Sequence, residues 1–403
     1  EITHDGGANT VEIRTIGSAE GFISNVSVIE ITDDTDLPRI NYKDGEGSLL
    51  LEPQSTNLIT KSVNWDNWAE VRTTLSFEQE TSPSGNQDAS LLVDSTDNNT
   101  HISQAIYYTS LGTSNVTWSL FAKKQNNRYV SLRLQDDAAN VSGNSNYIIA
   151  NYDLENVTVT DTLEIGTPTN AYADIQQYGN GWCRLIISMN KKSGITRTDL
   201  QIRLCKDGIA KTSEAFAGTG NDGNYFYGFQ LEELSYATSY IPTNGSTVTR
   251  LADVCNNSGN SDLINSTEGV LYAELAALSD DISQQIGVYG NSSTKQLRLE
   301  IANSVIRAQL YNGAYQTNMS STQTVKNFNK IAFKWKVNDF GLWINGTEVA
   351  SDSSGSTFSA NDLDRLNLSA QNGTSSLAKA EIKLIAVFKE ALSDTELQKL
   401  TTI

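Results

Sequence analysis

Short stretches in which apolar and polar residues alternate recur along nearly the whole chain, and polar bends separate them. Typical examples are Tyr129–Leu134 (YVSLRL), Leu200–Cys205 (LQIRLC) and Ala380–Phe388 (AEIKLIAVF). In a β-strand successive side chains point to opposite faces, so this pattern is typical of strands with one buried face. We therefore predict an all-β protein built of tandem β-sandwich or jelly-roll modules.

Length and charge narrow the possibilities further. At 403 residues the chain is longer than one hydrophobic core usually organises, so two or three domains are expected. The formal charge of −18 disfavours binding to nucleic acid and to anionic lipid, because both need a cationic surface. No apolar run approaches the ~18 residues of a membrane-spanning helix, so we expect no membrane insertion.

The sequence divides into three parts. Residues 1–45 contain two alternating segments, Thr10–Ile16 and Phe22–Ile31. Two strands cannot bury a core alone, so we interpret this part as the end of an upstream β module plus a linker. Because the chain begins at Glu1 without Met, we expect a processed product or a segment of a longer chain. Residues 48–254 and 262–403 would form two complete modules.

Alternation places most strands of both modules. In the first module we expect Val116–Lys123, Tyr129–Leu134, Tyr147–Asp153, Trp182–Met189, Leu200–Cys205 and Tyr225–Leu234. In the second we expect Gly269–Leu278, Gln284–Tyr289, Gln296–Ile301, Val305–Tyr311, Lys330–Val337, Gly341–Ile344, Thr347–Ala350 and Ala380–Phe388.

Two local signals refine the second module. Asn345-Gly346 between alternating residues predicts a hairpin with a type I′ turn. Ser393 followed by Glu396 has the spacing of a capping box, which predicts one short C-terminal helix over Leu392–Leu400.

The side chains of common catalytic mechanisms are scarce. Only His4 and His101 could serve as an imidazole base, and no G-x-S-x-G motif accompanies them. The second module also lacks the E-x-D-x-E pattern of concanavalin-type glucanases. We therefore expect no enzyme activity and assign His101 a structural or surface role. Of the three cysteines, Cys183 and Cys205 could pair on adjacent strands, but free buried thiols are the expected state.

Exposed aromatic rings are the usual platforms for sugars. Trp118, Trp182, Phe333 and Trp335 lie in alternating strands and are expected in the core. Trp65 and Trp68 lie in an Asn- and Asp-rich segment and are our first glycan-binding candidates, although a lid packed over the sandwich explains them equally well. The further candidates are Tyr107, Tyr108 and Tyr129.

We expect that the protein needs no cofactor, although the sequence is compatible with one bound calcium ion. Calcium takes several oxygen ligands from carboxylates and carbonyls in bent loops. The acidic residues in such loops are Asp94, Asp97, Asp136, Asp137 and Asp222. None lies in a complete EF-hand spacing, so solvated turns are the simpler interpretation.

Several blocks of sequence resemble known modules. The first module resembles a carbohydrate-binding-module-like jelly roll that occurs in phage tail, fibre and baseplate proteins. The residues that carry this resemblance are Leu49–Leu58 (LLLEPQSTNL), Trp65, Trp68, Gly179–Arg184 (GNGWCR), Gly228–Pro242 (GFQLEELSYATSYIP) and Thr249–Asp253 (TRLAD). The second module resembles a laminin-G-like, concanavalin A-type sandwich, and the residues that carry this resemblance are Glu268–Glu274, Phe328–Val349 and Ile382–Leu400.

The resemblance implies a non-enzymatic protein on the exterior of a virion, in a tail, fibre or other appendage. It would bind host cell-surface polysaccharide or act as a structural spacer beside other virion proteins, and a homo-trimer is left open. Two alternatives remain: a binding appendage or fragment of a polysaccharide-degrading enzyme, and a secreted bacterial adhesin.

Overall fold

Residues 39–42, 46–108, 115–136, 146–192, 194–212, 214–280 and 283–403 are described by the computed structural model. The chain divides into two units, Glu1–Arg39 and Ile40–Ile403, and the second is the subject here. The strands expected at Thr10–Ile16 and Phe22–Ile31, and His4 with them, lie outside the described residues.

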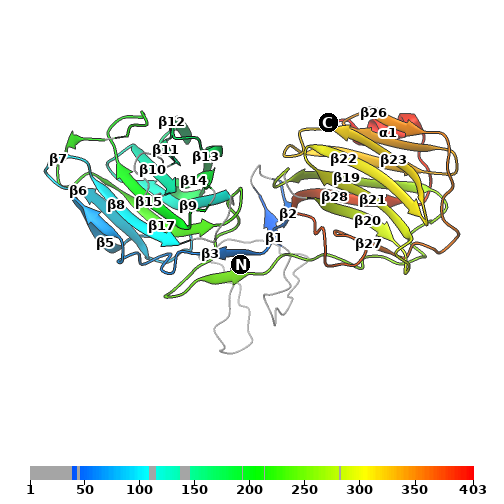
Figure 1. Cartoon of the computed structure of the whole chain (residues 1–403), viewed down its shortest axis with the longest axis horizontal. Helices are drawn as coiled ribbons and strands as arrows, with labels where there is room; N and C mark the ends of the chain where they lie inside the picture. Colours follow the sequence, from blue (N-terminus) through cyan, green and yellow to red (C-terminus); the bar gives the residue numbers. More distant parts are fainter. Residues whose placement is uncertain are drawn as a thin grey trace, which may run out of the picture. The chain divides into compact units, whose positions relative to one another are not determined.

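Two six-stranded antiparallel sheets form a first sandwich (Figure 1). One sheet has the order β12-β11-β10-β15-β8-β4. Its strands are β4 (Ala69–Val71), β8 (Ile102–Tyr108), β10 (Tyr129–Asp136), β11 (Asn146–Asp153), β12 (Thr158–Ile165) and β15 (Arg197–Leu204). The other has the order β13-β14-β9-β17-β6-β5. Its strands are β5 (Thr73–Glu80), β6 (Ala89–Asp94), β9 (Asn115–Lys124), β13 (Thr169–Gln177), β14 (Trp182–Asn190) and β17 (Gly223–Glu232).

Two small ribbons flank this sandwich. Strand β3 (Ser55–Asn57) pairs with β18 (Val248–Arg250), and β7 (Asn98–Asn99) pairs with β16 (Phe216–Ala217). The core of the sandwich lies between its two large sheets, where Trp118 of β9 packs in one cluster with apolar residues of β10 and β15. Trp118 and Trp182 are buried, as expected for aromatic residues of alternating strands.

A seven-stranded and a five-stranded sheet form the second sandwich. The larger has the order β1-β2-β28-β19-β24-β25-β26. Its strands are β1 (Arg39–Asn41), β2 (Ser48–Leu51), β19 (Gly269–Ala277), β24 (Asn329–Trp335), β25 (Phe340–Ile344), β26 (Thr347–Asp352) and β28 (Ala380–Phe388). The smaller has the order β23-β22-β21-β20-β27. Its strands are β20 (Gln284–Tyr289), β21 (Lys295–Ala302), β22 (Val305–Asn312), β23 (Tyr315–Thr322) and β27 (Arg365–Asn367).

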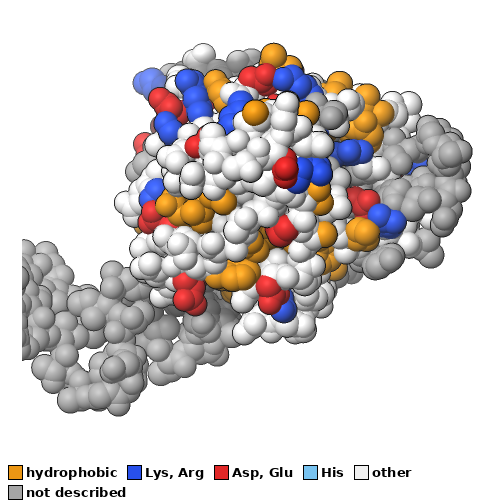
Figure 2. Space-filling view, turned by 90° about the vertical axis from the view of Figure 1, so that its left-hand side faces the viewer, with side chains coloured by type: hydrophobic (Ala, Val, Ile, Leu, Met, Phe, Trp, Pro, Cys, Tyr) orange, Lys and Arg blue, Asp and Glu red, His pale blue; other side chains and the backbone are white. Residues whose placement is uncertain are grey.

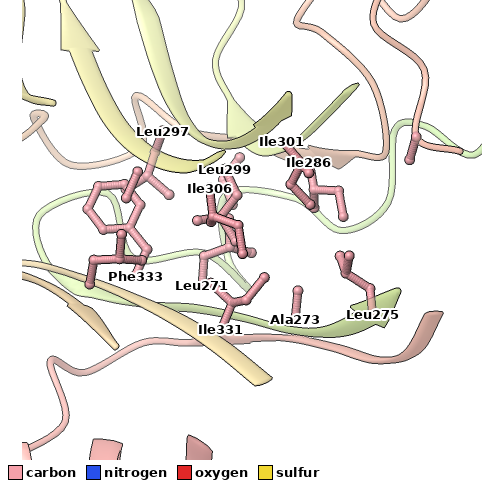
Figure 3. Packing of buried hydrophobic residues seen from close by; sticks show 14 of the residues in the cluster. Leu271, Ala273, Leu275, Ile286, Leu297, Leu299, Ile301, Ile306, Ile331 and Phe333 are labelled. Carbon is pink, nitrogen blue, oxygen red and sulfur yellow. The ribbon is translucent and has the colours of Figure 1, made fainter. Parts of the chain in front are cut away.

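Apolar side chains of both sheets meet between the layers of the second sandwich. Figure 3 shows Leu271 of β19 and Phe333 of β24 below, with Leu297 and Leu299 of β21 above. All four are buried. Apolar and polar side chains alternate along each of these strands, which is the pattern that predicted sheets with one buried face. The polar side chains of the five-stranded sheet therefore lie on its outer face.

The C-terminal helix α1 (Asp394–Thr401) follows the predicted cap Ser393 and begins two residues after the predicted start at Leu392. Ser393 caps it, and the reciprocal bond from Glu396 completes the capping box. Its buried Leu397 packs in a cluster with Val270 and Trp343 on the outer side of the seven-stranded sheet. No helix among the described residues is long and apolar enough to cross a membrane.

The structure confirms the predicted fold class: antiparallel sheets in sandwiches with one C-terminal helix. The type I′ hairpin is confirmed too, because φ is positive at both Asn345 (52°) and Gly346 (83°). Strand β2 pairs with β28, so Ser48–Leu51, at the predicted start of the first module, joins a sheet of the second sandwich. The domain limits themselves stay predictions.

The sequence blocks that carry the family resemblance are joined by buried hydrogen bonds. Ser55 Oγ donates to Glu232 Oε1 at 2.6 Å, and the backbone N–H of Thr238 donates to Glu232 Oε2 at 3.0 Å. All three residues are buried. These bonds join β3 to β17 and to the loop that follows β17.

Asn57 is the centre of this network and is completely buried. Its Nδ2 donates to the carbonyls of Phe229 and Ile241, both at 2.9 Å. Its Oδ1 accepts from the N–H groups of Ile59 at 3.1 Å and Leu231 at 3.2 Å. The buried hydrogen bonds of these blocks therefore help to hold the first sandwich together.

The cysteines are free thiols. Cys183 lies in β14 and Cys205 directly follows β15, so the two belong to different sheets. Both are buried, whereas Cys255 is exposed. This confirms free buried thiols for the first two and excludes the alternative pairing.

Candidate functional site

The outer face of the sheet formed by β12, β11, β10, β15, β8 and β4 is rich in hydrogen-bonding side chains. On β15, Leu200 and Ile202 point into the core, so the alternate residues point outward. The register places Gln104 opposite Gln201, and Gln201 opposite Arg133. We call the outward side chains of β8, β15 and β10 the polar face: Gln104, Ile106, Arg133, Gln135, Arg197, Asp199 and Gln201.

An open hollow of about 320 Å³ lies on this face. It is lined by Asn67 and Ala69 on one side, by Gln104–Tyr107 of β8, and by Arg197 and Asp199–Gln201 of β15. Strand β4 begins at Ala69, which lies opposite Gln104 in the register. Because the sheet edge stops there, the outer surface of β8 is left open beside it.

Polar side chains around the hollow hold one another in place. Gln201 Nε2 donates to Gln104 Oε1 at 3.1 Å. Arg197 donates to both carboxylate oxygens of Asp199, from Nε at 2.8 Å and from a terminal nitrogen at 3.0 Å. Side chains fixed in this way on strands lose little conformational entropy when they bind a ligand.

Arg133 is the cation that β10 contributes to the polar face. Its guanidinium carbon lies 4.0 Å from the centroid of the Tyr147 ring. Its Nε is buried and has no hydrogen-bond partner within the part of the chain that the structure describes. Burial lowers the pKa of Arg133, although Tyr147 and Asp199 act in the opposite direction.

The two tryptophans predicted to bind glycan lie behind the hollow, in the core. The exposed fractions are 0% for Trp65 and 5% for Trp68. Trp65 packs 4.8 Å from Phe229, and Trp68 packs 5.9 Å from Trp118 (ring centroids). Neither ring has a face open to solvent, so this corrects the expectation that they stack on sugar. The alternative of a packed lid fits their burial.

Tyr107 connects these tryptophans with the hollow. Its hydroxyl accepts a hydrogen bond from Trp68 Nε1 at 3.3 Å. Burial raises the pKa of Tyr107, so the phenol stays protonated near neutral pH. Tyr107 therefore lines the hollow and contacts the core residue Trp68.

The other two tyrosine candidates lie at the end of β8 and at the start of β10. Tyr108 ends β8 opposite Arg197, and its side chain lies outside the description. Tyr129 begins β10, where the Arg128 guanidinium carbon lies 5.2 Å from its ring centroid. Of the two tyrosines whose side chains are described, Tyr107 lines the hollow and Tyr129 does not.

The acidic residues considered for calcium make hydrogen bonds to the protein. Asp94 Oδ1 accepts the N–H of Gly220 at 2.9 Å and of Asp222 at 3.2 Å, and Lys206 lies 3.5 Å from its Oδ2. Asp136 accepts the N–H of Asn146 at 2.7 Å.

The remaining three candidates are Asp222, Asp97 and Asp137. Asp222 Oδ2 accepts from Lys206 Nζ at 2.7 Å, Asp97 Oδ2 accepts from Ser95 Oγ at 2.8 Å, and Asp137 lies outside the described residues. Among the residues that are described, no group of three or more His, Cys, Asp or Glu is arranged to hold a metal.

His101 is completely buried, which fits a structural role. Its Nδ1 lies 2.7 Å from the carbonyl oxygen of Arg72, and its ring packs 4.5 Å from that of Phe216. It therefore links β7 and β16 to the sheets.

Figure 2 views the molecule from the side on which β5 to β7 lie in Figure 1. Acidic and basic side chains are scattered there among uncharged surface and a few hydrophobic side chains. The charge on this visible face is mixed, in a chain whose net charge is −18.

Sequence reasoning missed the polar face because it searched for aromatic residues. Gln201 and Arg133 alternate with core residues in strands that were predicted, so the period-two pattern alone places them outward, whereas Arg197 precedes the predicted start of its strand at Leu200. The outward position of Gln104 could not be predicted, because its strand β8 was not among the predicted strands.

No protein-family profile matches the chain, and no curated protein matches it. Among solved structures, the CBM40 module of a Ruminococcus gnavus sialidase is 17% identical, with 38% of this chain and 96% of that chain covered and a TM-score of 0.32. A leech intramolecular trans-sialidase is 21% identical, with coverage of 38% and 27% and a TM-score of 0.32. The NanB sialidase of Streptococcus pneumoniae is 20% identical, with coverage of 36% and 27% and a TM-score of 0.29. These distant likenesses concern β-sandwich domains and assign no ligand to this chain.

Proposed function

We propose that this chain is a non-enzymatic glycan-binding protein and that the polar face of the first sandwich binds the saccharide. The observation that carries the proposal is the open hollow flanked by the Gln104–Gln201 and Arg197–Asp199 pairs. Amide, guanidinium and carboxylate groups together offer the donors and acceptors that sugar hydroxyls need.

The lining of the hollow also suits a sugar ring. Ile106 is 49% exposed and Ala69 is exposed too, so apolar surface lies beside the polar pairs. Sugar rings present C–H surfaces as well as hydroxyls, and ligand sites typically combine apolar walls with a few placed polar groups. The volume of about 320 Å³ falls within the usual range for small-ligand sites.

A glycan array with the full chain tests this proposal, followed by titration calorimetry with the best ligand. The array should include α2,3- and α2,6-sialyllactose, the sugars bound in structures of the R. gnavus module. The double variant Gln104→Ala, Gln201→Ala should lose about tenfold or more in affinity, since two ligand hydrogen bonds are worth about 1 kcal/mol each.

The matched control is Gln176→Ala, Gln177→Ala on β13, in the opposite sheet of the same sandwich. This pair changes the same chemistry away from the polar face and should leave affinity within about twofold. Equal affinity of wild type and the Gln104 and Gln201 variant, with both folded, would remove the polar face as the binding site.

We further propose that the protein acts on the exterior of a virion, as part of a tail, fibre or appendage, and attaches it to host polysaccharide. The support is the sequence resemblance of Leu49–Leu58 and Gly228–Pro242 to phage modules. Antibody labelling of intact particles, with inhibition of adsorption by the purified chain, tests this. New reducing ends released from polysaccharide would instead favour an enzyme.

A further inference from the structure

The five-stranded sheet of the second sandwich has a second polar outer face. Leu297 and Leu299 of β21 point into the core, so Arg298 between them points outward. The register aligns Arg298 with Gln309 of β22, and Gln309 with Asn318 of β23. We call the group formed by Arg298, Gln296, Gln309, Asn318 and Tyr315 the Arg298 face.

Three neutral acceptors hold the guanidinium of Arg298. Its Nε donates to Gln309 Oε1 at 2.8 Å, and one terminal nitrogen donates to Tyr315 Oη at 3.1 Å. The other terminal nitrogen donates to Gln296 Oε1. A guanidinium has five N–H donors, so one remains on each terminal nitrogen.

Arg298 has no carboxylate partner within ion-pair distance among the described residues. The neighbouring Arg307 differs, because it pairs with Glu300 at 3.4 Å. An unneutralised arginine on a half-buried sheet face is unusual in a chain of net charge −18. Its two remaining donors suit two oxygens of one anionic group.

An aromatic platform adjoins this cation. Tyr315 is 52% exposed and packs edge-on against Tyr311 with ring centroids 5.2 Å apart. Because Tyr315 also accepts from Arg298, its ring is held at the cation's side. Beside them, Gln309 Nε2 donates to Asn318 Oδ1 at 3.1 Å. The face thus combines a cation, an exposed ring and an amide pair.

We propose that the Arg298 face is a second, independent binding site and that its ligand is an acidic saccharide. The acidic group, a carboxylate or a sulfate ester, pairs with Arg298. The sugar ring contacts Tyr315, and hydroxyls reach the amides of Gln309 and Asn318. Tandem sites on one chain would raise the avidity for a repeating polysaccharide.

Titration calorimetry on the full chain tests this with three probes of equal length: an oligosaccharide of uronic acids, a sulfated oligosaccharide and a neutral glucose oligosaccharide. Arg298→Gln should weaken binding of the acidic probe by about tenfold or more, because a charge-assisted pair is lost. Arg307→Gln is the matched control on the next strand and should stay within about threefold.

The probes separate the two sources of anion. Binding of the uronate alone or the sulfated sugar alone supports the proposal and names the group. Equal binding of the neutral probe overturns it, as does unchanged affinity in folded Arg298→Gln. If that variant is unfolded, Arg298→Lys and Tyr315→Ala replace it, and retained affinity in both overturns the proposal.

This site and the polar face are tested separately. Loss of acidic-probe binding in Arg298→Gln but not in Gln104→Ala, Gln201→Ala assigns the ligand to the second sandwich. The reverse result keeps the polar face as the binding site and removes the Arg298 face.

Discussion

Replacing Asn57 tests whether the buried hydrogen bonds between Leu49–Leu58 and Gly228–Pro242 stabilise the fold. Asn57→Ala removes four hydrogen bonds inside the first sandwich. Two carbonyls and two N–H groups lose their partner in a site that water does not reach. Each unsatisfied buried group typically costs about 1–3 kcal/mol, but the surroundings relax, so we expect a total loss of about 4 kcal/mol.

Urea unfolding followed by tryptophan fluorescence measures this loss. Trp65, Trp68, Trp118 and Trp182 lie in the first sandwich, so its transition gives most of the signal. The midpoint should fall with the slope unchanged. The exposed Asn64 is the matched control, and Asn64→Ala should change stability by less than about 0.5 kcal/mol. A loss below about 1 kcal/mol in Asn57→Ala would refute the reasoning.

Two further predictions concern acid and thiol chemistry. Hydrogen bonds from Arg128 lower the pKa of Asp153 from 3.8 to about 2, so this stabilisation is present above about pH 4 and is lost as pH falls through 2. Because Arg128 is partly exposed, the advantage of wild type over Asp153→Asn should shrink by about 1–2 kcal/mol from pH 5 to pH 2 in urea unfolding; a constant difference would contradict this. A thiol reagent should label only Cys255 in the folded chain and all three cysteines in urea, and rapid labelling of Cys183 or Cys205 would contradict their burial.

Much of the fold could be predicted because its signal is local. Alternation gave β20 and β28 with the bounds found, and the capping residues gave helix α1. Strands β12 and β13 were missed because they carry many Thr, Asp and Asn residues and only a few half-buried apolar ones. Their strand geometry comes from pairing with β11 and β14, which no local pattern encodes.

The candidate site could be predicted only in part, for the same reason. Trp65 and Trp68 looked exposed because their neighbours are polar, yet their environment is set by Phe229, far away in the sequence. The Gln104–Gln201 pair joins residues 97 positions apart, so only the strand register reveals it.

Hydrogen–deuterium exchange of the full chain, with and without the best array glycan, tests the polar face most directly. The account predicts slower exchange in Ile102–Tyr108 and Arg197–Leu204 when the glycan is bound, with β13 and β14 unchanged. Protection confined to other strands, with none in β8 and β15, would contradict it.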